Sequence, residues 1–265
     1  MKASAYIAGV GVLGPGLCNW PQAAAVLAGR EAYVPAATVL PSPVMLPPAE
    51  RRRTGRVVKV ALGVAGEAAS SAGADVAQLS SVFTSSGADG QICHEICQAL
   101  ALPAREVSPT RFSNSVHNVT AGYWSIATGS QAPSNVLCAF DGSFAAGLLE
   151  SLIQTSVDRC PVLLVAYDAE YPPPLHFKRP IPDAFGVAML LTPEQTTRSL
   201  ARIEVTLTDE ACDSMAATQL ESLRGAIPAA RALPLLLLLA TGAGGRAIIE
   251  YLDVSRIAVQ VDTCS

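Results

Sequence analysis

The chain has 265 residues, of which 50% are hydrophobic and 15% are charged, and its formal net charge is −4. This composition supports a large buried core and excludes a disordered protein. The acidic balance leaves no extended basic surface, so we expect no nucleic acid among the partners. The sequence has one basic cluster, Arg51-Arg52-Arg53, which we interpret as a solvated loop or helix start rather than a phosphate site.

Seven cysteines are scattered along the chain without the spacing of a disulfide framework, which favours a reducing, cytoplasmic location. The most apolar run, Leu233 to Ala243, is shorter than the roughly 20 residues that span a bilayer. It predicts a buried core helix that stops at the glycines from Gly242 onward, and no membrane span. Cys93 and Cys97 lie one helical turn apart but have no second ligand pair. We interpret them as core residues and expect no metal or cofactor.

Apolar periodicity and turn residues predict alternating strands and helices along the chain. In order, the expected elements are a strand over 5–13, a turn over 14–16, a helix over 20–29, a proline-rich loop over 35–49, a helix over 49–72, a strand over 82–84, helices over 89–102 and 117–128, a strand over 135–140, a helix over 143–155, and strands over 161–166, 187–192 and 201–207. This alternation predicts an α/β layered fold. Because the strands are continuous apolar runs, helices should cover both faces of the sheet.

The most specific pattern lies between Ser108 and Gly129, which reads SPTRF, then NSVHN, then AGYWSIATG. It resembles a group of short ketosynthase-like proteins, described as β-ketoacyl synthase N-terminal or chain-length-factor-like, from pathways to aryl polyene pigments. Two further segments, Tyr6–Leu13 and Ala132–Gly147, are similar to the opening strand of a ketosynthase and to the strand, turn and helix that hold its nucleophile. The resemblance covers residues 1 to about 195 and fades beyond.

The resemblance implies a thiolase-like fold of α, β and α layers, forming a single domain over residues 1–265. Full-length ketosynthases contain two related βαβαβ units. Only about 70 residues follow the strand that is expected to end at 192. We therefore expect a chain that is truncated relative to full-length ketosynthases, with its second half reduced after about 195.

A condensing ketosynthase uses a cysteine thiolate as its nucleophile. Matching Gly142 and Ala145–Gly147 to the family pattern places Ala139 at that position and Cys138 one residue before it. Because a shift of one residue turns a strand side chain to the opposite face, we expect Cys138 to point into packing. Ser143 lacks the flanking glycines of a serine-hydrolase turn, so we interpret it as a helix-capping residue.

A ketosynthase also needs two histidines that polarise the malonyl thioester. The three histidines of this chain, His94, His117 and His176, offer no equivalent pair. We interpret His117 as a buried, hydrogen-bonded structural residue at the start of a helix. The chain is therefore not expected to condense acyl chains by itself.

The resemblance then implies a non-catalytic, chain-length-factor-like subunit of fatty acid or polyketide-type polyene biosynthesis. It would pair with a full-length ketosynthase, or form a homodimer, and shape the acyl tunnel, with an acyl carrier protein as a further candidate partner. The residues expected to form the acyl pocket or degenerate active site are Ala139, Phe140, Asp141, His117 and Trp124, with the helix over 116–124. The residues expected at the subunit interface are Asn135, Val136 and Leu137, on the strand that ends at Ala139.

Two alternatives remain open at this stage. The first is a minimal acyltransferase or thioesterase with Cys138 as nucleophile and His117 as its base, which requires a hydrogen bond between the two side chains. The second is a scaffold that binds an acyl carrier protein but no acyl chain.

Overall fold

A computed structural model describes residues 3–264, which fold around one sheet of eight strands in the order β3-β2-β4-β5-β1-β6-β8-β7. The strands are β1 (Ala3–Leu13), β2 (Ser80–Thr84), β3 (Ser134–Leu137), β4 (Val162–Asp168), β5 (Phe185–Thr192), β6 (Ala201–Thr208), β7 (Gly245–Leu252) and β8 (Ser255–Thr263). The α-helices are α1 (Trp20–Leu27), α2 (Pro48–Arg51), α3 (Arg56–Ala72), α4 (Gly90–Ala101), α5 (Pro109–Asn114), α6 (Val119–Thr128), α7 (Ser143–Asp158), α8 (Leu175–Lys178), α9 (Thr218–Ala226) and α10 (Leu233–Thr241). Short 3-10 turns form η1 (Val76–Gln78), η2 (Phe140–Gly142) and η3 (Pro228–Ala232).

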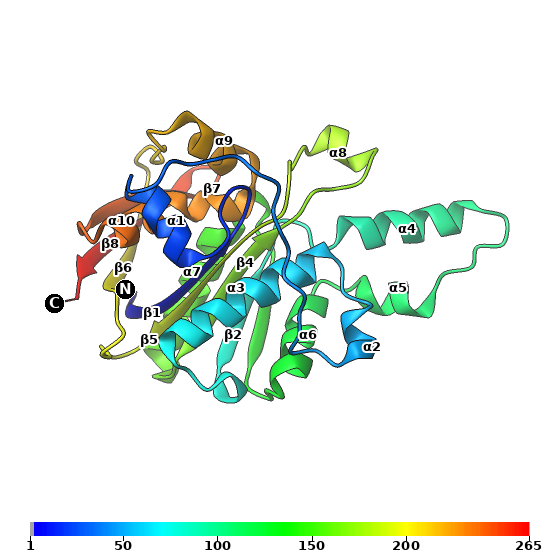
Figure 1. Cartoon of the computed structure of the whole chain (residues 1–265), viewed down its shortest axis with the longest axis horizontal. Helices are drawn as coiled ribbons and strands as arrows, with labels where there is room; N and C mark the ends of the chain where they lie inside the picture. The colour runs from blue at the N-terminus through cyan, green and yellow to red at the C-terminus, as the bar shows by residue number, and fades with distance from the viewer. Residues whose placement is uncertain (1–2, 265) are drawn as a thin grey trace.

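Helices cover both faces of the sheet (Figure 1), as the continuous apolar strands predict. Within β4, Val162 and Leu164 pack with α1, α7 and α10 on one face, while Leu163 and Val165 pack with α3 and α6 on the other. Strands β3, β2 and β4 run parallel, and every later neighbour in the sheet order runs antiparallel. The layered α/β fold predicted from the sequence is confirmed.

The helix α3 lies unusually close to the central strand β1. A Cβ atom added at Gly11 would come within 2.1 Å of the carbonyl oxygen of Val64, and one added at Gly9 within 2.2 Å of that of Ala68. The Gly-punctuated opening strand is therefore needed for this contact, because any side chain there would separate the two layers.

Helices α4 and α5 form an arm that extends away from the sheet (Figure 1). An ion pair of 2.6 Å between Arg111 and Glu95 joins its two helices. The interpretation of Cys93 and Cys97 as core residues is wrong, because both lie on α4 of the arm and are exposed. Helical spacing places them on one face, but neither layer of the core covers that face.

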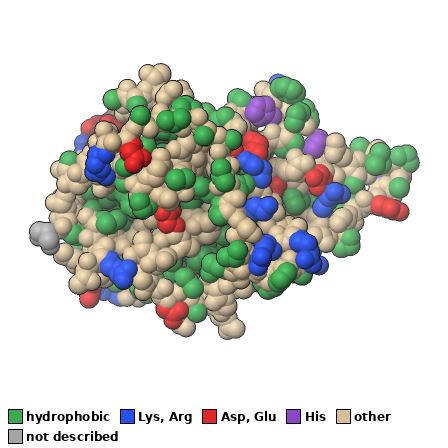
Figure 2. All heavy atoms as spheres, viewed as in Figure 1, with side chains coloured by type: hydrophobic (Ala, Val, Ile, Leu, Met, Phe, Trp, Pro, Cys, Tyr) green, Lys and Arg blue, Asp and Glu red, His purple; other side chains and the backbone are tan. Residues whose placement is uncertain are grey.

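The basic cluster lies at α2, near the base of the arm, where Figure 2 shows several basic side chains on this side of the molecule. The Arg51 guanidinium donates to the carbonyl oxygens of Val44 at 3.1 Å and Leu46 at 3.0 Å. Arg53 pairs with Glu50 at 3.0 Å. The cluster thus closes the preceding loop and lies at the C-terminal end of a short helix, not at a helix start.

The chain after residue 195 extends the sheet by β6, β8 and β7 and covers it with α9, η3 and α10. The apolar run forms α10, of which Leu233 to Leu236 are buried, and Gly242 ends it with a left-handed φ of +60°. Among residues 3–264, no helix combines the length and the apolar character that crossing a bilayer requires.

Replacing Gly11 by alanine is expected to destabilise the chain by about 3 kcal/mol, because α3 must move away from β1. The matched control is Gly122→Ala in α6, where an added Cβ meets nothing within 4 Å and a gain of up to about 1 kcal/mol is expected. Urea unfolding followed by circular dichroism measures both. A Gly11→Ala variant as stable as the parent chain would contradict the close packing of α3 on β1.

Candidate functional site

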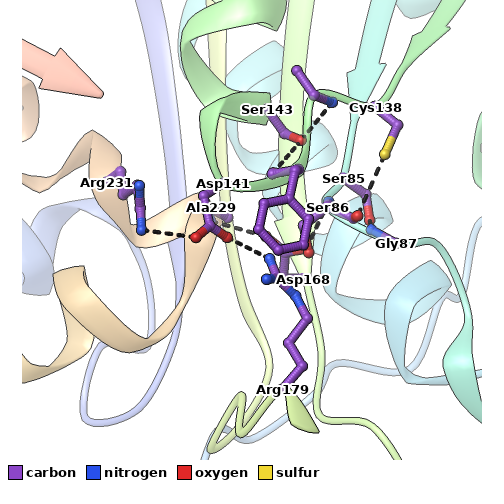
Figure 3. Close-up of polar contacts among 12 residues, drawn as sticks. Ser85, Ser86, Gly87, Cys138, Asp141, Ser143, Asp168, Arg179, Ala229 and Arg231 are labelled. Carbon is purple, nitrogen blue, oxygen red and sulfur yellow. Dashed lines mark hydrogen bonds and ion pairs between the residues drawn. The ribbon is translucent and has the colours of Figure 1, made fainter. Parts of the chain in front are cut away.

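The turn between β3 and α7, residues 138–143, is here called the elbow (Figure 3). Its apex is Phe140, whose φ of +50° is uncommon for a residue with a side chain and costs conformational energy. Ser143 holds the turn, because its hydroxyl accepts a hydrogen bond from the Ala139 N–H at 3.0 Å and donates one to the Phe140 carbonyl at 2.7 Å. The strained apex is therefore Phe140, one residue beyond the position predicted for the nucleophile.

The elbow forms one wall of a cavity of about 730 Å³, here called the elbow cavity. The opposite wall comes from the hairpin of β7 and β8, including Tyr251, Leu252 and Val254. Gly142 allows this approach, because a Cβ atom there would lie 1.8 Å from the Tyr251 carbonyl oxygen. Three residues predicted for an acyl pocket, Ala139, Phe140 and Asp141, line the cavity together.

Two arginines from distant parts of the chain bind Asp141 (Figure 3). Arg179, which follows α8, pairs with one carboxylate oxygen, and Arg231 of η3 donates to the other at 3.2 Å. The Arg179 guanidinium also lies 3.9 Å from the centre of the Phe140 ring, a cation–π contact. The elbow is thus clamped by charge on one side and by ring stacking on the other.

Asp168, the last residue of β4, binds Ser86, whose carbonyl oxygen accepts a hydrogen bond from Cys138 of the elbow. Its buried carboxylate accepts hydrogen bonds from the Ser86 N–H at 2.9 Å, the Ser86 hydroxyl at 2.6 Å and the Ala229 N–H at 2.9 Å. Burial raises the pKa of this carboxyl to about 6, although the hydrogen bonds and the nearby Arg179 charge oppose the shift. Sequence reasoning missed Asp168, whose signal was an acidic residue ending a strongly apolar strand.

The position of Cys138 in the strand predicted that its thiol points into the packed interior. This prediction is wrong. Cys138 is exposed, and its Sγ donates a hydrogen bond of 3.3 Å to the Ser86 carbonyl oxygen. The strand ends at Leu137, so the strict alternation of faces no longer applies one residue later.

His117 lies in the turn before α6, half-buried, and its Nε2 is buried without a hydrogen-bond partner. Burial lowers its pKa, so the imidazole is neutral at pH 7. No hydrogen bond joins it to Cys138 in the part of the chain that the structure describes. The pair required by the acyltransferase alternative is therefore not assembled in this structure.

The other predicted residues lie away from the elbow cavity. Trp124 is buried in the core beneath α3. His94 and His176 lie on α4 and α8, so the three histidines are on separate elements. Within residues 3–264, no group of three or more His, Cys, Asp or Glu side chains is arranged to hold a metal ion.

The strand predicted for a subunit interface, β3, lies at an edge of the sheet, and among residues 3–264 it pairs with β2 alone. Asn135 is exposed and donates to Glu150 at 3.1 Å, while Val136 and Leu137 are half-buried. The outer side of β3 therefore offers unpaired backbone groups, the arrangement that another strand can extend.

The sequence matches the family described as "Beta-ketoacyl synthase, N-terminal domain" over residues 19–233. The chain belongs to this family. The family match runs beyond residue 195, where the resemblance read from the sequence fades. A search among curated proteins finds no match.

Solved structures agree on the fold of this ketosynthase relative. It is similar to a chain of the "Ketosynthase (ApeO) in Complex with its Chain Length Factor (ApeC) from Xenorhabdus doucetiae", with a TM-score of 0.74 and 22% identity over 97% of this chain and 99% of that chain. It is also similar to "The ishigamide ketosynthase/chain length factor", with a TM-score of 0.73 and 13% identity over 99% and 100% of the two chains. Against a β-ketoacyl synthase from Burkholderia phymatum the TM-score is 0.57 at 13% identity, and the match covers 91% of this chain but 71% of that chain. The fold is thus thiolase-like, in a chain shorter than that synthase.

Acidification should stabilise the wild type relative to Asp168→Asn. Folding raises the pKa of Asp168 to about 6 from 3.8. The stability that the protonated carboxyl adds to the folded state is therefore fully present below pH 3.8 and is lost as the pH rises through 6. Between pH 7 and pH 4.5 the stability difference should move in favour of the wild type by on the order of 2 kcal/mol. Urea unfolding of both proteins at each pH measures it. A difference that does not change with pH would contradict the buried carboxyl.

Proposed function

We propose that the chain is a non-catalytic, chain-length-factor-like partner of a full-length β-ketoacyl synthase, acting in fatty acid or polyketide-type polyene biosynthesis. One observation carries the proposal: among the described residues that line the elbow cavity, none is a cysteine or a histidine. The apex of the turn carries Phe140, a side chain that cannot accept an acyl group as a thiolate does. Such a turn can shape a tunnel, but the residues it contributes to this cavity include no cysteine nucleophile.

Exposed apolar side chains support a partner subunit. The arm and the adjoining helix α6 expose five large hydrophobic residues, which are Leu100, Leu102, Phe112, Val116 and Ile126. Apolar surface gathered on a projecting element is typical of a protein interface. Together with the free edge of β3, it favours a partner that contacts the arm and the strand before the elbow.

Two solved structures of similar fold carry both names. One is a ketosynthase in complex with its chain length factor, and the other is named as a ketosynthase/chain length factor. A third, named as AntDE:AntF with an acyl-carrier protein and its ketosynthase, matches all of both chains with a TM-score of 0.76 at 10% identity. These names support a heterodimer with a full-length ketosynthase for this chain, and an acyl carrier protein as a further partner. In such a pair, Phe140 would contribute to the wall of the acyl tunnel.

A minimal acyltransferase or thioesterase that uses Cys138 remains the second candidate. The observation in its favour is the exposed thiol of Cys138 at the start of the elbow. Against it stands the absence, within the described structure, of a hydrogen bond from the thiol to His117. An acyl-independent carrier scaffold would differ from both, because it would bind loaded and unloaded carrier protein equally.

Cys138→Ala should leave the activity of the complex unchanged. The chain is co-expressed with the full-length ketosynthase of the same gene cluster, and malonyl-dependent chain extension is assayed with and without it. The variant complex should retain activity within about twofold of the parent, because no step uses this thiol. Acyl transfer by the chain alone that disappears with Cys138→Ala would make it an enzyme and reject the proposal.

Phe112→Glu should abolish co-purification with the ketosynthase. Phe112 is 69% exposed on the arm, so a charge there leaves the monomer folded but must be desolvated in an interface. The matched control is Val39→Glu, an 81% exposed apolar residue outside the arm, which should co-purify normally. Equal co-purification of both variants would exclude the arm from the interface.

A further inference from the structure

A second cavity lies beside the elbow cavity and has a markedly basic lining. It measures about 240 Å³, and its charged side chains are Lys178, Arg179, Arg231 and Asp141. We call it the basic pocket. Asp141 and Arg231 line both cavities, so the ion pairs of the elbow separate the two spaces.

The two guanidinium groups of the basic pocket have few acceptors. Each guanidinium carries five N–H donors, yet Asp141 is the one carboxylate that pairs with either Arg179 or Arg231 in the described structure. The Nε atoms of both arginines are buried without a hydrogen-bond partner. Their side chains are only 19% and 17% exposed, so water satisfies these donors poorly.

The charges around the pocket do not balance either. Lys178 has no ion pair within residues 3–264, so three cations face the single carboxylate of Asp141. The nearby carboxylate of Asp168 is already bound by Ser86 and Ala229 (Figure 3). An anion that enters the pocket would therefore find unused donors and net positive charge.

We infer that Arg179, Arg231 and Lys178 form a binding site for a phosphate oxyanion, and that Asp141 occupies this site when no such anion is bound. The planar donors of two arginines suit the oxygens of a tetrahedral phosphate, and the lysine adds a point charge. The site would take this group either as free phosphate or as part of an ester, since both present the same oxygens. This inference does not rest on the proposed partnership with a ketosynthase.

Phosphate binding at this site is coupled to the elbow. Asp141 directly follows the strained Phe140, and the Arg179 group that would bind phosphate also stacks on the Phe140 ring. Exchange of Asp141 for an external anion removes one of the contacts that hold the turn. The basic pocket thereby provides a route by which a ligand alters the wall of the elbow cavity.

The test is a titration of the purified full-length chain with inorganic phosphate at constant ionic strength, balanced with potassium chloride. Isothermal titration calorimetry and thermal unfolding follow binding. The wild type should bind saturably. Asp141→Asn, which removes the competing charge, should bind about tenfold more tightly, and Arg231→Gln about tenfold more weakly.

Two further variants complete the design. Lys178→Gln removes an exposed charge without disturbing packing and should weaken binding severalfold. Arg246→Gln is the matched control, because Arg246 pairs with Glu210 at 2.7 Å at the other end of β7, and it should bind like the wild type. Repeating the titration with butyl phosphate shows which form of phosphate the site accepts. Binding as tight as that of inorganic phosphate indicates the phosphate group of an ester, and loss of binding indicates free phosphate.

Non-saturable behaviour of the wild type would overturn the inference. Binding by Arg231→Gln and Lys178→Gln equal to that of the wild type would also overturn it, as would an Asp141→Asn variant that folds but binds no more tightly. If Asp141→Asn fails to fold, the arginine and lysine variants decide the question. None of these outcomes depends on whether the ketosynthase co-purifies.

Discussion

The buried carboxylate of Asp168 is the interaction on which the arrangement of the site depends. It lies at the end of β4 and accepts hydrogen bonds from Ser86, which follows β2, and from Ala229 in η3. A charged group without solvent is costly unless its oxygens are bonded. The three donors offset part of that cost, and they join the parallel part of the sheet to the C-terminal segment that carries Arg231. This connection is one of the contacts that place Arg231 opposite Asp141.

The elbow combines a strand, a turn and a helix in the order that the family resemblance predicts. Its backbone keeps a strained apex at Phe140 and a serine that bonds both sides of the turn. The side chains that this turn places in the elbow cavity include the ring of Phe140 and the clamped carboxylate of Asp141. Strain of this kind is retained when surrounding contacts over-determine it, and here two arginines and the β7–β8 hairpin provide those contacts.

The sheet is asymmetric in a way that bears on assembly. On one side, β7 ends the sheet as part of a hairpin with β8 that also forms the wall of the elbow cavity. On the other side, β3 is a short parallel edge strand directly before the elbow. The apolar arm projects near the helices that cover this half of the sheet (Figure 1). A partner bound here would contact both the strand that leads to the elbow and the exposed apolar residues of the arm.

The sequence by itself determined the layered fold, because continuous apolar strands require cover on both faces, and it indicated the ketosynthase family through the segment from Ser108 to Gly129. It also placed Ala139, Phe140 and Asp141 together, since they are neighbours in the chain. Only the tertiary structure decided which distant groups meet them: Asp141 and Arg231 are 90 residues apart, and Asp168 and Ala229 are 61 apart. Likewise, helical spacing showed that Cys93 and Cys97 share a face but not that the face is uncovered. Periodicity describes one element at a time, whereas contacts between elements depend on how the whole chain packs.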